Sequence, residues 1–274
     1  MTETAAAAAR PAATGEPLLS LRNINKSFGA VQVLRGVNFS AHAGEVTALV
    51  GDNGAGKSTL IKCIGGIHPI DSGDFIYDGN SVHVHSPRDA SDLGIEIVYQ
   101  DLALCDNLDI VQNMFLGRER KNGLVLDEAS METSAKETLA SLQVRTVKSI
   151  RQLVASLSGG QRQTVAIAKA VLWNSRVVIL DEPTAALGVA QTRQVLDLVR
   201  RLADNGLAVV LISHNLVDVF EVADRISALY LGQVAAEVRT TDVTSGQVVE
   251  LITAGRTDGV PSAIPTATTD GSPA

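Results

Sequence analysis

Short apolar runs and stretches of helical spacing alternate along most of the chain. Apolar runs that are typical of buried strands occupy residues 45–50, 94–100, 176–183, 207–214 and 225–232. Apolar residues at three- and four-residue spacing predict helices over 189–206 and 215–224. Strands that alternate with helices imply a mostly parallel sheet with helices on both faces, so the pattern predicts an α/β fold.

Two further regions depart from this alternation. Runs of β type cover residues 17–28, 36–51 and 72–86. The last of these has the pattern of a hairpin with Asp78 and Gly79 at its turn. Residues from about 101 to 157 instead show helical spacing. We therefore expect an antiparallel β part and an inserted helical subdomain beside the parallel core.

The two ends of the chain differ from the middle in composition. Residues 1–16 are rich in alanine with proline and glycine, and residues 256–274 are rich in proline, serine, threonine and glycine. Such segments have little to bury, so we predict that both are disordered. One globular unit over residues 17–255 remains.

Composition and charge narrow the class of protein. The net charge of −7 argues against nonspecific binding to nucleic acid or anionic lipid as the main activity. Cys63 and Cys105 form no CxxC pair, which favours a reducing cytosol. No apolar run approaches the ~18 to 20 residues of a membrane helix, and the first residues lack a signal-peptide pattern.

The string "GDNGAGKST" at residues 51–59 matches the pattern G-x-x-x-x-G-K-[ST] between a predicted strand and a predicted helix. Its glycines let backbone N–H groups surround an anion, and the new helix adds its positive end. Lys57 is placed to reach the β- and γ-phosphates of a nucleotide, and Ser58 to ligate Mg²⁺. The candidate phosphate contacts are Gly51, Asp52, Asn53, Gly54, Ala55, Gly56, Lys57, Ser58 and Thr59.

A pair of carboxylates ends the apolar run "VVILDEP". In an open α/β sheet, ligands bind at the carboxyl ends of the strands. Asp181 is therefore a candidate to hold Mg²⁺, and Glu182 to act on the attacking water as base or orienter. Alternatively, the strand simply ends in a solvated acidic turn. The phosphate-binding motif (P-loop) at residues 51–59 favours the functional interpretation.

Three other residues are weaker candidates. Gln100 and His214 each end a predicted strand, where their side chains could reach a γ-phosphate or its water. Phe28 precedes a glycine outside any clear strand, and it could stack on a nucleotide base or belong to the core.

These motifs together resemble the ATP-binding cassette family, in family order from Phe28 to about Val238. Residues 51–59 resemble Walker A, 98–100 the Q-loop, 157–163 ("LSGGQRQ") the signature, 177–183 Walker B and 212–214 the H-loop. The resemblance implies a P-loop NTPase core of RecA type and hydrolysis of ATP. It also implies ATP and Mg²⁺ as ligands, with Ser58, Gln100 and Asp181 around the metal.

The signature implies a second subunit. In the family, two cassettes pair head to tail, and the signature contacts the γ-phosphate that the partner's P-loop holds. Small residues at a helix start expose N–H donors and a hydroxyl, which suits this role. The residues concerned here are Ser158, Gly159, Gly160 and Gln161. One chain has one P-loop and one signature, so we expect a homodimer with two ATP sites.

Within the family, residues 98–119, 181–202 and 213–226 resemble the bacterial carbohydrate-uptake branch. The resemblance implies membrane permease subunits, a periplasmic sugar-binding protein and a peripheral position on the cytoplasmic face of the inner membrane. It also implies that a groove near Gln100 grips the permease. Many members of that branch carry two cassettes in tandem, whereas this chain carries one.

Two other classes compete with a transport subunit. A soluble cassette acting on ribosomes or DNA would usually carry two cassettes and a charged linker, or long coiled coils, and none of these features occurs. A P-loop kinase or GTPase would not need "LSGGQ". We therefore expect no nucleic-acid partner.

Overall fold

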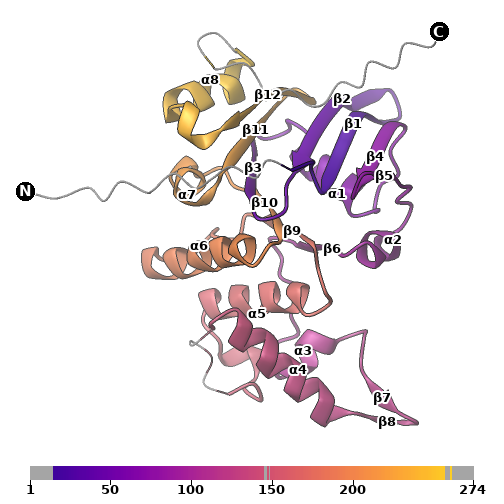
Figure 1. The fold of residues 1–274 in the computed structure, drawn as a ribbon. Helices are drawn as coiled ribbons and strands as arrows, with labels where there is room; N and C mark the ends of the chain where they lie inside the picture. Colours follow the sequence, from indigo (N-terminus) through magenta and orange to yellow (C-terminus); the bar gives the residue numbers. More distant parts are fainter. Residues whose placement is uncertain (1–14, 145–146, 148, 257–259, 261–274) are drawn as a thin grey trace, which may run out of the picture.

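The computed structural model describes residues 15–144, 147, 149–256 and 260. The predicted disorder of residues 1–16 and 256–274 falls almost entirely outside this part of the chain. The described residues form two large sheets, with a helical lobe at one end (Figure 1). None of their helices is both long and apolar enough to span a bilayer.

The larger sheet has six strands in the order β12-β11-β3-β10-β9-β6. Its parallel members are β3 (Val46–Gly51), β6 (Ile95–Val98), β9 (Val177–Asp181), β10 (Ala208–Ile212) and β11 (Arg225–Tyr230). The edge strand β12 (Gln233–Arg239) pairs antiparallel with β11. This sheet confirms the predicted parallel core, and its central strands are buried on both faces as their apolar runs require.

Alternate residues of these strands enter two different cores. Val178 and Leu180 belong to a cluster with α5 (Gly159–Val171) and α6 (Val189–Asp204). Val177 and Ile179 belong to a cluster with α1 (Lys57–Ile64) and the second sheet. A third cluster packs α7 (Leu216–Val222) and α8 (Ser245–Ala254) against β11 and β12. The period of two along each strand thus places helices on both faces.

The second sheet has the order β2-β1-β4-β5, with antiparallel pairing throughout. Its strands are β1 (Leu19–Phe28), β2 (Val31–Ala41), β4 (Ser72–Tyr77) and β5 (Asn80–Ser81). The predicted hairpin turn is confirmed: Tyr77 faces Asn80, and Asp78 and Gly79 both have positive φ, at 51° and 75°. A short helix that the sequence pattern did not reveal, α2 (Pro87–Asp92), follows.

The helical lobe contains α3 (Ile110–Phe115), α4 (Glu128–Ser141) and the start of α5, which packs on both. A small hairpin, β7 (Lys121–Asn122) and β8 (Val125–Leu126), projects from its far end (Figure 1). The predicted helical insertion is present, but the hairpin inside it was not predicted. Its strands are two residues each, too short to show a period of two.

Three local predictions were wrong. Phe28 is the last residue of β1, paired with Val31, because β1 continues to the turn at residues 29–30. Gln100 and His214 lie two residues beyond the ends of β6 and β10, since backbone pairing stops where the chain turns toward the sheet edge. His83 and His85, which fall within the predicted β run of residues 72–86, lie after β5 and not on a strand; their rings stack 5.9 Å apart.

Candidate nucleotide site

The P-loop connects β3 to α1, and its glycines are required by the backbone path. Gly54 and Gly56 have φ of 83° and 108°, a backbone conformation that residues with a Cβ atom rarely adopt. Gly51 lies so close to the carbonyl oxygen of Leu229 that a Cβ atom there would clash. The α1 helix begins at Lys57, so the N–H groups of its first turn face the loop.

The turn between β11 and β12 supports the P-loop through backbone hydrogen bonds. The N–H of Gly232, between β11 and β12, donates to the carbonyl of Ala55 at 3.0 Å, and the N–H of Arg35 donates to the carbonyl of Gly232 at 2.8 Å. A Cβ on Gly232 would overlap the backbone of Val33. Sequence analysis missed this contact, because only the tertiary fold brings the β11–β12 turn to the loop.

A cavity of about 360 Å³ opens at the carboxyl ends of the parallel strands. It is lined by Val33, Asp52, Asn53, Gly54, Gly56, Lys57, Ser58, Thr59, Gln100, Asp181, Glu182 and Ile212. Most of the predicted phosphate contacts and all three predicted Mg²⁺ ligands therefore meet in one space. Phe28, Gly51 and Ala55 do not line it, and neither do His214 or the signature residues.

Charges of both signs meet in this cavity. The Lys57 ammonium donates to the carbonyls of Gly51 and Asp52 at 2.6 and 3.0 Å. Burial lowers the pKa of Lys57, and nearby carboxylates oppose that shift. Burial and then the charge of Glu182 raise the pKa of Asp181. A half-buried carboxylate of this kind gains from a nearby cation.

The oxygen donors of the cavity suit a hard cation. Ser58 offers a hydroxyl, Gln100 an amide oxygen and Asp181 a carboxylate. Mg²⁺ prefers oxygen ligands and is usually held by one or two carboxylates together with substrate phosphates. The donor set therefore fits this metal.

Glu182 and His214 form a second unit beside the cavity. His214 Nδ1 lies 2.8 Å from Glu182 Oε2, and the His214 side chain is 76% exposed. Glu182 has φ of 51°, and its N–H donates to the carbonyl of Ile212 at 3.0 Å. This unusual backbone conformation turns Glu182 away from the path of β9. Both residues also line a smaller cavity of about 230 Å³.

A supporting network under this pair was missed by sequence reasoning. Asp218 accepts hydrogen bonds from Thr184 Oγ1 at 2.6 Å and from Asn215 Nδ2 at 2.9 Å, and its side chain is buried. The network joins the loop after Glu182 to the start of α7, just after His214. An Asn at the helix start followed by Asp in its first turn was the available signal.

The signature residues begin α5. Ser158 is the N-cap, and it exchanges two hydrogen bonds with Gln161 in a capping box. Ser158 and Gly159 are exposed. A Cβ on Gly159 or Gly160 would press on Leu187 or Gln191 from the α6 region. The glycines thus allow close packing on α6 while the helix start faces outward.

Phe28, at the end of β1, is 44% exposed. Its ring makes an edge contact with His68, at 5.1 Å between centroids. The ring therefore lies at the surface and not in the core.

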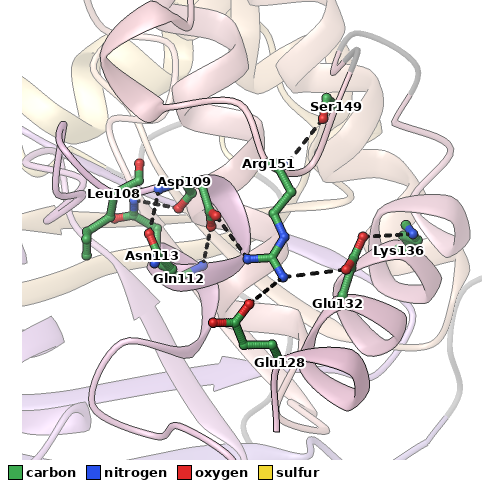
Figure 2. A network of polar contacts seen from close by, with 9 residues as sticks. All are labelled: Leu108, Asp109, Gln112, Asn113, Glu128, Glu132, Lys136, Ser149 and Arg151. Carbon is green, nitrogen blue, oxygen red and sulfur yellow. Dashed lines mark hydrogen bonds and ion pairs between the residues drawn. The ribbon is translucent and has the colours of Figure 1, made fainter. Parts of the chain in front are cut away.

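An apolar hollow of about 200 Å³ lies in the helical lobe, between α3, α4 and β8. Its walls include Leu108, Val111, Phe115, Leu116, Leu126 and Met131. Arg151 forms one side and bonds to Asp109 at 3.2 Å and to Glu128 at 3.0 Å (Figure 2). Because Asp109 caps α3 and Glu128 begins α4, this arginine ties the two helices together.

Comparison with known proteins identifies the class. The family model for the ABC transporter matches residues 34–185, more than half of the chain. The chain belongs to the ABC transporter family, and it is an ATPase of that family.

Among curated relatives, the chain is similar to two proteins of nearly its own length. It is 47% identical to a xylose/arabinose import ATP-binding protein of Sulfolobus acidocaldarius, over 86% of this chain and 94% of that protein. It is 46% identical to a fructose import ATP-binding protein of Rhizobium meliloti, over 88% and 95%. It is also 37% identical to a ribose import ATP-binding protein of Yersinia pestis, over 86% of this chain but only 46% of that protein.

Solved structures of cassettes share the fold. An ATP-binding cassette of an ABC transporter in its ADP conformation aligns with a TM-score of 0.75 and 25% identity, over 88% of this chain and 96% of that one. A dimeric cassette bound to ADP and phosphate after hydrolysis aligns with a TM-score of 0.67 and 25% identity, over 81% and 98%. These neighbours confirm the predicted P-loop NTPase fold.

Proposed function

We propose that this chain is the ATP-hydrolysing subunit of a sugar importer, and that the cavity at the strand ends binds the phosphates of MgATP. The single observation that carries the proposal is the meeting of Lys57, Asp181 and Glu182 in that cavity. The proposed phosphate contacts are residues 51–59, with Phe28 against the base. Backbone N–H groups of the loop and the positive end of α1 would stabilise the phosphate charge.

Ser58, Asp181 and Gln100 would hold the Mg²⁺ ion, which supplies charge neutralisation of the phosphates when it is bound. Burial and the charge of Glu182 disfavour the ionised Asp181 carboxylate, and a bound cation would offset both effects. Lys57 would exchange its carbonyl partners at Gly51 and Asp52 for phosphate oxygens. A lysine that is already partly buried loses less hydration in that exchange than an exposed one would.

Glu182 would position the attacking water and accept its proton, and His214 would contact the γ-phosphate. The contact of 2.8 Å between His214 and Glu182 supports a joint role, because one residue then fixes the direction of the other. Through Asn215, the Asp218 network would hold the backbone around His214. These groups stabilise a transition state chiefly by orientation and charge.

The second subunit in this proposal is another copy of the chain, arranged head to tail. The signature residues Ser158, Gly159, Gly160 and Gln161 lie outside the cavity lining, which supports a role at the partner's site. Their exposed helix start offers donors to an anion. A solved cassette of the same fold is dimeric after hydrolysis.

Sugar import is proposed from the relatives, which are named as import ATP-binding proteins for xylose/arabinose, fructose and ribose. The partners would be membrane permease subunits and, through them, an extracytoplasmic sugar-binding protein. The chain would then sit on the cytoplasmic face of the membrane. The resemblance placed the permease contact in a groove near Gln100. The apolar hollow between α3, α4 and β8, which Gln100 does not line, is a second candidate, because Leu116 and Leu126 are exposed there.

Reconstitution tests this function directly. The chain is combined with candidate permease and sugar-binding subunits, in vesicles that contain ATP, and uptake of labelled pentoses and hexoses is measured. We expect ATP-dependent uptake of one sugar and stimulation of hydrolysis by the loaded binding protein. Hydrolysis stimulated instead by ribosomes or nucleic acid, with no uptake, would favour the soluble alternative.

A further inference from the structure

Among the described residues, no strand pairs with the end of β1 on the side of β4. Pairing between β1 and β4 stops at Asn25 and Ser72, whereas β1 continues to Phe28. The loop of residues 65–71, between α1 and β4, lies along the uncovered edge. The N–H of Asp71 donates to the carbonyl of Asn25 at 2.9 Å, where regular pairing ends.

At this edge, the Asp71 side chain supplies a hydrogen-bond acceptor that a neighbouring strand would otherwise supply. Its Oδ2 accepts the N–H of Ser27 at 2.6 Å, and its Oδ1 accepts a hydrogen bond from Lys26 Nζ at 2.7 Å. The Lys26 side chain is only 10% exposed, so this carboxylate compensates a buried charge. The hydrogen bond from Lys26 and then that from Ser27 lower the pKa of Asp71.

The same loop touches the ring of Phe28. His68 makes the edge contact at 5.1 Å with an interplanar angle of 76°, and the Lys26 ammonium lies over the ring, 5.4 Å from its centroid. A phenylalanine that is 44% exposed would otherwise have freedom to change rotamer. Contacts from two residues, one of them anchored by Asp71, restrict it.

We infer that Asp71 and His68 are positioning residues that hold Phe28 in place for a nucleotide base. Asp71 acts through Lys26 and the backbone of Ser27, and His68 acts directly on the ring. This rests on the base contact proposed for Phe28. A ring held in its binding orientation before the ligand arrives loses less entropy on binding. The loop also follows α1, so one continuous segment runs from the phosphate site to the base site.

The test compares a ligand that has a base with one that has none. Titration calorimetry measures the affinity of the full chain for ATP and for inorganic tripolyphosphate, each with Mg²⁺. The variants are Phe28→Ala, His68→Ala, Asp71→Ala and Asp71→Asn. Asp78→Ala is the matched control, because Asp78 is also an exposed carboxylate in an ion pair of 2.7 Å, with Arg176. Thermal unfolding checks that each variant folds.

We expect Phe28→Ala to weaken ATP binding about tenfold, the order for loss of one base stack. Asp71→Ala and His68→Ala should weaken it about threefold to fivefold, and Asp71→Asn less, because it still accepts from Ser27. Tripolyphosphate affinity should stay within about twofold of wild type in every case, because that ligand has no base. Asp78→Ala should change neither affinity.

Two results would overturn the inference while leaving the base contact intact. One is a loss of ATP affinity in Phe28→Ala alone, with Asp71→Ala and His68→Ala unchanged. The other is an equal loss for ATP and tripolyphosphate, which marks a general disturbance of the fold. If Phe28→Ala itself binds ATP normally, the base contact proposed above is wrong and the positioning role falls with it.

Discussion

The P-loop and the signature segment are both glycine-rich turns that begin a helix, yet their surroundings differ. The P-loop opens on a cavity that also contains Asp181 and Glu182 from another strand end. The signature begins α5 at an exposed surface, where Ser158 and Gln161 cap each other. The start of α1 thus shares a cavity with the candidate catalytic residues Asp181 and Glu182, and the signature residues do not line that cavity.

This difference supports the proposal that a single chain supplies only half of each catalytic centre. Both helix starts offer similar N–H donors, so a glycine-rich turn alone does not indicate which of them binds the chain's own nucleotide. The converging carboxylates and the lysine favour the P-loop cavity as the MgATP site. In the proposed arrangement, the signature contributes where another molecule brings phosphate to it. The following changes test this contrast, from the largest expected effect to the smallest.

Glu182→Gln should reduce kcat about a thousandfold, because an amide cannot accept the proton of the attacking water. The substitution conserves size, so ATP affinity should hold and ATP-bound dimers should accumulate. Steady-state hydrolysis and size-exclusion chromatography with ATP measure both effects. Glu221→Gln, on the exposed side of α7, is the matched control. Turnover within tenfold of wild type would reject Glu182 as the principal acid–base residue.

Lys57→Ala should weaken ATP binding about a hundredfold, because it removes charge-assisted hydrogen bonds from a partly buried site. Calorimetry with MgATP measures the change. Lys136→Ala removes an exposed lysine of α4 and should leave the affinity unchanged. An ATP affinity close to wild type in Lys57→Ala would refute its role at the phosphates.

Ser158→Ala should slow hydrolysis about tenfold while ATP binding to the dilute single chain stays normal. The hydroxyl would be lost from the partner's site, not from the chain's own cavity. Ser158 also caps α5, so we expect a loss of about 1 kcal/mol in the free energy of unfolding. Ser156→Ala is the neighbouring control. If the dilute single chain of Ser158→Ala lost ATP binding, the assignment of the signature to the partner's site would be wrong.

Mixing the Lys57→Ala chain with the Ser158→Ala chain should have the smallest effect on hydrolysis, but that effect is specific to the head-to-tail arrangement. A mixed dimer of Lys57→Ala and Ser158→Ala combines one intact P-loop with one intact signature across the interface. If half of the dimers are mixed, about a quarter of the sites should be restored. Hydrolysis by the mixture should therefore exceed the mean of the two separate preparations. No gain at any mixing ratio would argue against the head-to-tail arrangement.

The sequence predicted the site where local pattern and chemistry coincide. Gly54 and Gly56 have the positive φ that a phosphate loop needs, and Asp181 ends its strand at the cavity, as its position after an apolar run indicated. Prediction failed where the partner is distant in sequence. Neither the hydrogen bond from Gly232 to Ala55 nor that from Lys26 to Asp71 has a local sequence pattern, because each joins segments that are more than forty residues apart.

Periodicity by itself determined that strands and helices alternate, since a strand buried on both faces must be apolar throughout and a helix must present one apolar side. Motif spacing determined the kind of ligand, since few residue sets surround phosphate closely. Only the tertiary structure decided which turns meet. It brought the ends of β3, β6 and β9 to one cavity and left the start of α5 outside it, because parallel strands bring their carboxyl ends to the same edge of the sheet.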